Sequence, residues 1–225
     1  MNNNHRPKEA WKRQRKLQEI YNQEEVPSIE EIYTKVKQIE YGKTNPTMQT
    51  LQARALISMY YLTACRVSEI VRSKKKDWDK EKKDYIFKGI KGVDLKTDVF
   101  QGMDVFYIRT KNRKHKKRKT KRQPIPIGFE YEHKLFMIIK EYTNKINEES
   151  LMFDFSDKRA TQIMNDVFDW NVHFMRHVRC THLITMYDFN EQALIKFMGW
   201  TDSRPAKAYM ELSPKTILKE FYKGV

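Results

Sequence analysis

A β-prone segment in the first half of the chain interrupts sequence that otherwise has helical periodicity, and this pattern restricts the fold more than any other feature. The runs Tyr85–Phe87 and Val105–Ile108 are rich in β-branched and aromatic residues, and two prolines keep Gln123–Ile127 extended. These three runs predict a small antiparallel sheet. The sequence on either side of them favours helices, so we expect an α+β fold that is mostly α.

The helical segments carry clear start signals. Ser28 and Glu31 have the spacing of a capping box, which predicts a helix beginning there. A second helix is expected from Thr47, followed by a short one at Arg66–Ile70. After the sheet, the spacing of apolar residues predicts further helices over about 129–146, 157–169, 174–188, 190–198, 203–211 and 214–222.

The charge of the chain indicates a polyanionic partner. It has 44 Lys and Arg residues against 29 Asp and Glu residues, which gives a formal net charge of +15. Such a surplus favours nucleic acid first and an anionic membrane surface second. No apolar run approaches the roughly 20 residues that cross a bilayer, and the polar N-terminus lacks the hydrophobic part of a signal peptide.

Cysteine and glycine usage excludes two further classes. Two cysteines do not make a disulfide scaffold, so we expect a protein of the reducing cytoplasm. With nucleic acid as the expected partner, its place there would be the nucleoid. The seven glycines form no phosphate-cradling cluster, which argues against a nucleotide-binding loop.

Three distant segments hold pairs of charged and aromatic side chains in a definite order and spacing. They contain, in order, Arg66 with Glu69, His173 with Arg176, and Trp200 with Tyr209 nine residues later. In this order and spacing they resemble the catalytic domain of the tyrosine recombinases, the phage integrase family, over residues 47–225. Residues 1–46 would then form a basic N-terminal arm with one amphipathic helix.

The resemblance implies a DNA breaking-rejoining core that cleaves DNA through a 3′-phosphotyrosyl intermediate, without metal or ATP. Tyr209 would attack the phosphorus. Arg66 and Arg176 would bind the non-bridging oxygens with forked donors. His173 would take the tyrosine proton or hold the phosphate, and Trp200 would donate its indole N–H to a phosphate oxygen.

The family also has a catalytic lysine on a turn between two strands, and Lys111 matches that place best, although other lysines crowd the same turn. Glu69 would orient the cationic groups, and His177 would support the helix or pack beneath the site. The residues expected to contact the DNA backbone are Lys12, Arg13, Arg109, Lys114, Lys116, Lys117 and Arg118.

Other interpretations of the same residues stay open. Arg66 and Glu69 could be a simple surface pair, and Trp200 could be a core aromatic. His173, His177, Cys180 and His182 could conceivably bind a metal, but no ligand set follows the usual structural-zinc pattern, and we expect no metal site. The basic run 111–122 could be a localisation signal or a solvated tip.

Two rival functions share much of this pattern. One is a type IB topoisomerase-like nicking-closing enzyme, and the other is a non-catalytic DNA-binding protein derived from an integrase. Family members usually carry a larger N-terminal domain than the 46 residues found here, so the basic arm could serve as the second jaw on double-stranded DNA. The resemblance also implies a tetramer on DNA, with the tail after Tyr209 docking on a neighbouring subunit or on its own core.

Overall fold

The computed structural model describes residues 26–41, 46–73, 78–110, 121–168 and 172–211. The chain divides into two compact units. One is Ser28–Arg179, and the other joins the N-terminal segment up to Pro27 to the chain from Cys180 onward. Within the described residues, no helix is long and apolar enough to cross a membrane.

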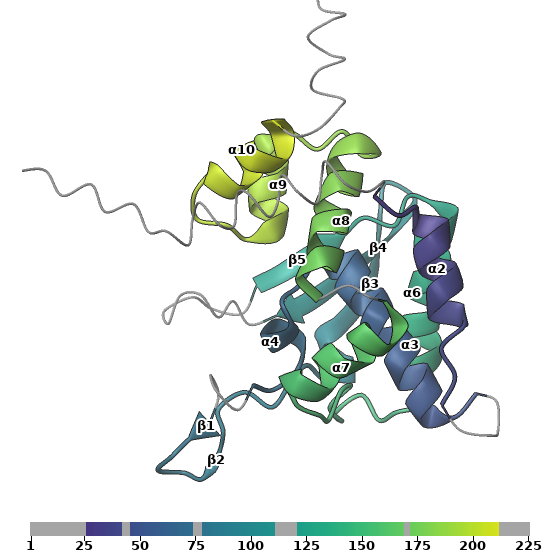
Figure 1. The fold of residues 1–225 in the computed structure, drawn as a ribbon, viewed down its shortest axis with the longest axis vertical. Coiled ribbons are helices and arrows are strands. Elements are labelled where there is room, and N and C mark those ends of the chain that lie inside the picture. The colour runs from purple at the N-terminus through teal and green to yellow at the C-terminus, as the bar shows by residue number, and fades with distance from the viewer. Residues whose placement is uncertain (1–25, 42–45, 74–77, 111–120, 169–171, 212–225) are drawn as a thin grey trace, which may run out of the picture. The chain divides into compact units, whose positions relative to one another are not determined.

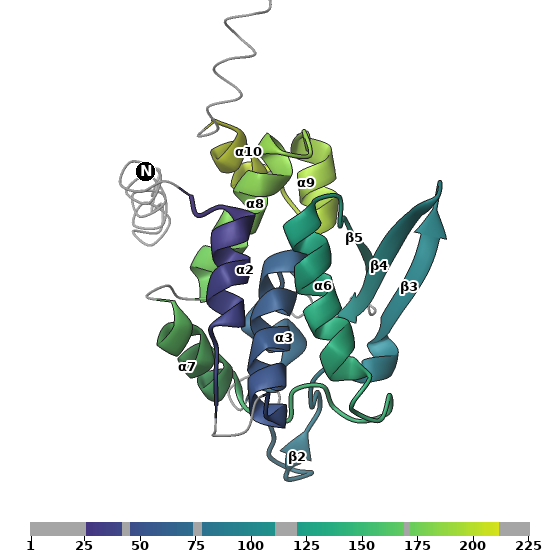
Figure 2. The same ribbon diagram turned by 90° about the vertical axis from the view of Figure 1, so that its right-hand side faces the viewer.

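Three helices of the Ser28–Arg179 unit lie side by side (Figure 2). They are α2 (Ile29–Lys37), α3 (Met48–Thr63) and α6 (Glu130–Thr143). The capping box is confirmed, because the Ser28 hydroxyl accepts from the Glu31 N–H while the Glu31 carboxylate accepts from the Ser28 N–H. The helix expected from Thr47 is also confirmed as α3, which is buried along almost its whole length.

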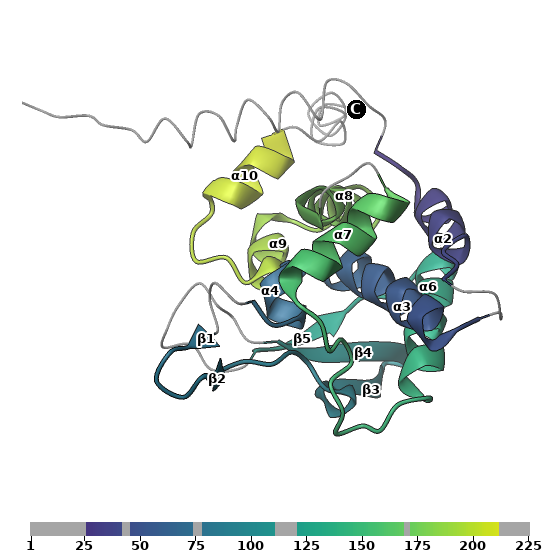
Figure 3. The same cartoon turned by 60° about the horizontal axis from the view of Figure 1, so that its bottom comes forward.

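An antiparallel sheet accompanies these helices (Figure 3). Its strand order is β3-β4-β5, formed by β3 (Leu95–Phe100), β4 (Met103–Thr110) and β5 (Lys121–Ile125). The sheet packs apolar side chains inward, since Phe106, Ile108 and Ile125 are buried. The prediction of a mostly helical α+β fold with a small antiparallel sheet is therefore confirmed.

The prediction that the run Tyr85–Phe87 belongs to the same sheet as the other two runs is wrong. Tyr85 lies in β2 (Asp84–Tyr85), which pairs only with β1 (Trp78–Asp79) in a separate two-stranded hairpin. The third strand of the main sheet is β3 instead. Five of its six residues are exposed, so no buried face marks it in the sequence.

The remaining elements follow the predicted order (Figure 1). In Ser28–Arg179 they are α4 (Val67–Ile70), the 3-10 turn Gly92–Asp94 and α7 (Asp157–Val167). Helix α8 (Val172–Thr185) contains the boundary between the units, and α9 (Glu191–Met198) and α10 (Arg204–Glu211) follow it. The helix expected at 214–222 lies outside the described residues.

Candidate active site

The turn after α3 is the structural centre of the candidate site in the Ser28–Arg179 unit. Helix α3 ends at Ala64, which adopts the left-handed conformation with φ 50° and ψ 23°. The Thr63 hydroxyl accepts a hydrogen bond from the Cys65 N–H at 3.1 Å, which steadies the turn. Arg66 is then extended and caps the short helix α4. The chain therefore reverses sharply just before the first predicted catalytic residue.

Arg176 reaches this turn from α8. Its guanidinium donates to the carbonyl oxygen of Ala64, two residues before Arg66. Arg176 is only 5% exposed, so its charge is held in a nearly dry position. The structure thus attaches two predicted phosphate-binding arginines, distant in sequence, to one backbone turn.

Glu69 holds Arg66 in a defined orientation. One carboxylate oxygen accepts from the Arg66 guanidinium at 2.9 Å, and the other accepts from the Arg66 backbone N–H at 2.8 Å. The Glu69 side chain is 10% exposed and the Arg66 side chain is 33% exposed, so the pair opens toward solvent at the arginine. An arginine held in this way keeps donors available for an anion.

His173 and His177 lie one turn apart on α8. Their ring centroids are 4.9 Å apart and the planes are nearly perpendicular, at 83°. His173 is exposed, whereas His177 is largely covered. Burial, together with the nearby His173 and Arg176, lowers the pKa of His177 to about 3. His177 is therefore neutral at physiological pH.

Trp200 and Tyr209 belong to the unit that contains Cys180 onward. Helix α9 ends at Gly199 in the left-handed conformation, and Trp200 follows directly. The Trp200 and Tyr209 rings stack with centroids 5.9 Å apart and an interplanar angle of 13°. Tyr209 is 4% exposed. The nine-residue spacing in the sequence thus corresponds to a direct ring contact between Tyr209 of α10 and Trp200, which lies two residues after α9.

Several predicted residues cannot be placed in this way. Lys12, Arg13, Lys111, Lys114, Lys116, Lys117 and Arg118 lie outside the described residues. Arg109 lies in β4, where the register sets it opposite Arg122 of β5. In the described part of the chain, no group of three or more His, Cys, Asp and Glu could hold a metal ion.

A buried arginine and its carboxylate partner were not among the predicted residues. Arg179 of α8 and Glu132 of α6 form an ion pair that is fully excluded from solvent. The sequence signal for Arg179 is its place between Val178 and Cys180, inside a helix with many apolar residues. That signal does not identify the partner, which is 47 positions away.

Comparisons with known proteins identify the family of this chain. The model of the phage integrase family matches residues 22–216. The structure of XerH site-specific recombinase bound to palindromic difH substrate, a post-cleavage complex, has a TM-score of 0.53 and 15% sequence identity. That match covers 86% of this chain and 50% of XerH, so this chain spans about half the length of XerH.

A second solved structure is less similar. XerA recombinase matches with a TM-score of 0.46 and 13% identity, covering 87% of this chain and 63% of XerA. No curated protein sequence matches this one. At 15% identity, the structural likeness to XerH concerns the fold.

Proposed function

Because this chain belongs to the phage integrase family, we propose that it is a site-specific DNA recombinase that cleaves and rejoins double-stranded DNA through a 3′-phosphotyrosyl intermediate. The observation that supports this most directly is the attachment of Arg176 to the Ala64 carbonyl, beside Arg66. Two cationic forks near one turn are suited to the charge on a five-coordinate phosphorus.

In the proposed reaction, the Tyr209 oxygen loses its proton and bonds to phosphorus while the bond from phosphorus to the 5′-oxygen breaks. The departing 5′-oxygen takes a proton from a lysine, which we assign to Lys111. A free tyrosine has a pKa of about 10, so it is a weak nucleophile at neutral pH. Most of the rate enhancement must therefore come from stabilising the phosphate charge with Arg66 and Arg176.

His173 and Trp200 complete the proposed catalytic set, and Glu69 and His177 support it. His173 is exposed on the same helix as Arg176, where it could accept the tyrosine proton or hold the phosphate. Glu69 orients Arg66 through the two bonds described above. Trp200 donates its indole N–H to a phosphate oxygen once DNA is bound. His177, kept neutral by burial, packs against His173 without adding charge.

We also propose the organisation around this site. Residues 47–225 form the catalytic domain, and the arm within residues 1–46 binds the DNA backbone through Lys12 and Arg13. Arg109 and the basic residues 114–118 contact the backbone near the lysine turn. Four subunits assemble on DNA through the segment after Tyr209, and the site of action is the nucleoid.

The decisive experiment traps the covalent intermediate. In a suicide substrate, a nick lies a few nucleotides to the 3′ side of the scissile phosphate. Cleavage then frees a short oligonucleotide that carries the 5′-hydroxyl. Its loss prevents religation, so the adduct accumulates. The wild-type protein should form a protein–DNA adduct that peptide mapping locates at Tyr209. Tyr209→Phe should bind the DNA but form no adduct, while Tyr187→Phe, a tyrosine that follows α8, should behave as wild type.

The alternatives give different results. A non-catalytic DNA-binding protein would form no adduct with any variant. A nicking-closing enzyme would form the adduct and relax supercoiled plasmid, but it would not exchange strands between two DNA duplexes. Strand exchange therefore separates the recombinase from the topoisomerase-like enzyme.

A further inference from the structure

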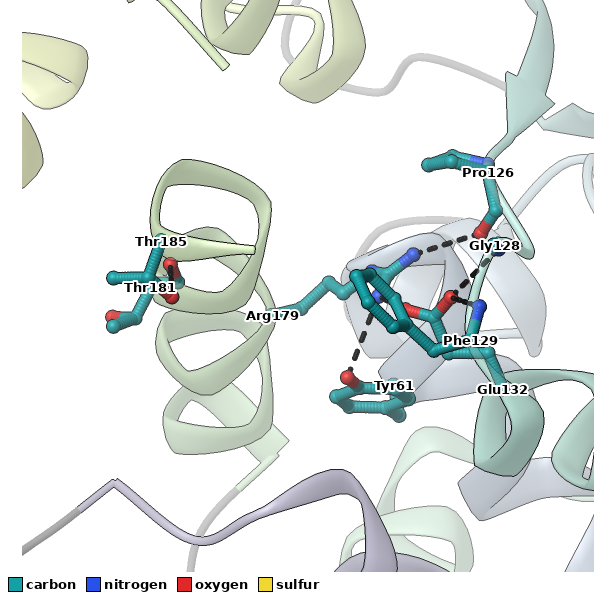
Figure 4. A network of polar contacts seen from close by, with 8 residues as sticks. All are labelled: Tyr61, Pro126, Gly128, Phe129, Glu132, Arg179, Thr181 and Thr185. Atoms are coloured by element: carbon teal, nitrogen blue, oxygen red, sulfur yellow. Dashed lines mark hydrogen bonds and ion pairs between the residues drawn. The ribbon is translucent and has the colours of Figure 1, made fainter. Parts of the chain in front are cut away.

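A fully buried ion pair involves Arg179 of α8, which Figure 4 shows with its polar contacts and which lies about one helical turn beyond Arg176 in the sequence. Arg179 donates from Nη1 to Oε1 of Glu132, and both side chains have zero solvent exposure. Arg176 and Arg179 are three positions apart on α8, so their side chains leave neighbouring parts of the helix. The pair is therefore close in the fold to the proposed phosphate-binding arginine without being part of the exposed site.

Glu132 is itself fixed by the start of α6. Its second oxygen, Oε2, accepts from the backbone N–H groups of Gly128 and Phe129 at 3.0 and 3.2 Å. A carboxylate is favoured at this position by the partial positive charge of a helix N-terminus. The anion that holds Arg179 is therefore rigidly attached to the connection between β5 and α6.

Arg179 joins this connection to α3 as well. Its Nη2 donates to the Pro126 carbonyl at 3.0 Å, and its Nη1 donates to the Tyr61 hydroxyl at 3.4 Å. The guanidinium carbon also lies 5.0 Å from the Tyr61 ring centroid. One side chain thus links α8, the end of β5 and α3.

The two arginines of α8 contact α3 in matching register. Arg176 meets Ala64, and Arg179 meets Tyr61, three positions earlier on α3. The buried Met175 and Val178 of α8 oppose sliding of this helix, and the contact of Arg176 with Ala64 adds a polar constraint. The contact of Arg179 with Tyr61, one turn further along α8 and one turn back along α3, adds a second polar constraint on the same register. A misplacement of about 1 Å at a reacting centre can cost about 10²-fold in rate.

Stability alone explains this pair poorly. Removing two charges from water is costly, and replacement of a buried ion pair by apolar residues of similar volume is often neutral or stabilising. A buried polar network with several directed hydrogen bonds does, however, define geometry, because each member has few acceptable positions.

We propose that Arg179 and Glu132 are positioning residues for DNA cleavage, which hold α8 in the register that places Arg176 at the turn of Ala64 and Arg66. This inference rests on the proposed function. It assigns the pair no contact with DNA: the effect on the reaction passes through Arg176.

The test removes both charges together. In the double variant Arg179→Met with Glu132→Gln, methionine replaces the aliphatic stem, and glutamine keeps an acceptor for the N–H groups of Gly128 and Phe129. No unpaired charge is left buried, although the Pro126 carbonyl loses its donor, so the free energy of unfolding should fall less than in either single variant, which leaves one charge buried alone. Single-turnover adduct formation on the suicide substrate should nevertheless fall by about 10-fold or more.

A substrate change separates positioning from general damage. When the scissile phosphodiester is replaced by a methylphosphonate, the non-bridging charge that Arg176 neutralises is absent. On the methylphosphonate substrate, the rate of adduct formation by the double variant should be less than about threefold below that of wild type. The same should hold for Arg176→Ala. Arg179→Lys, which keeps the charge but loses the fork, should show the same contrast between substrates.

Arg54→Met is the matched control. Arg54 is another buried arginine, 7% exposed, which donates to the carbonyls of Ile39 and Lys37 at the end of α2. Its replacement should lower the free energy of unfolding and reduce the rate of adduct formation by the same factor on both substrates.

The proposal is overturned if wild type forms the Tyr209 adduct while the double variant cleaves at the wild-type rate. It is also overturned if the double variant loses the same factor in rate on both substrates. A wild-type protein without the adduct would instead refute the proposed function.

Discussion

The guanidinium of Arg176 donates a hydrogen bond to the carbonyl oxygen of Ala64, the left-handed residue at which α3 ends. The donor and acceptor are 112 positions apart in the sequence. The bond places Arg176 beside the turn from which Arg66 emerges. It also gives a hydrogen-bond donor to the carbonyl of Ala64, a residue that is fully buried. Arg176 therefore has a structural partner in addition to its proposed phosphate.

The first prediction separates these two roles of Arg176. Arg176→Ala should lower single-turnover cleavage by about 10²–10³-fold, because a preorganised donor to the phosphate is lost. It should also lower the free energy of unfolding by about 1–3 kcal/mol, since the Ala64 carbonyl loses its donor. Cleavage on the suicide substrate and denaturant unfolding measure the two effects. Cleavage at the wild-type rate would contradict the phosphate role.

The second prediction concerns the charge of Glu69. In Glu69→Gln, the side-chain carbonyl can still accept a bond, but the charge-assisted contact with the Arg66 guanidinium weakens. We expect the transition state to lose about 1 kcal/mol, or about fivefold in cleavage rate, which is less than the loss in Arg66→Ala. Glu191→Gln, an acidic residue in the first turn of α9, should leave cleavage unchanged.

Local patterns explain which parts of the fold could be predicted. The capping box at Ser28, the apolar spacing of α3 and the contact between Arg66 and Glu69 all involve residues within one or two helical turns, so the sequence shows them directly. Strand β3 was not predicted because its residues are mostly exposed and show no alternation of buried and exposed side chains. A strand of this kind is defined by its pairing with β4.

The buried ion pair could not be predicted for a related reason. A sequence shows that Arg179 is a charged residue among apolar neighbours, but three of its contacts come from segments that only the folded chain brings together. The same limit applies to the bond between Arg176 and Ala64. The resemblance to a family identified Arg176 by motif, whereas its backbone partner became visible only in three dimensions.

The third prediction tests the basic arm. If Lys12 and Arg13 contact phosphates, replacing both by alanine should reduce the slope of log Kd against log salt by up to about 1.8, because each lost contact removes about 0.9. Exchanging the two residues, Lys12→Arg with Arg13→Lys, should keep the slope. DNA binding measured over a series of salt concentrations provides the data. An unchanged slope in the alanine variant would show that these residues do not touch the backbone.

The fourth prediction follows from the burial of His177. Its pKa is about 3 in the folded protein and 6.5 as an ordinary histidine, so between these values the unfolded chain binds a proton that the folded protein does not. Stability should therefore fall as the pH is lowered from 6.5 toward 3, by at most about 1.4 kcal/mol per pH unit for this one group. His177→Gln should flatten the profile, while His133→Gln, at an exposed histidine of α6, should not. Denaturant unfolding measured across this range gives the profiles, and equal slopes for wild type and His177→Gln would refute the assignment.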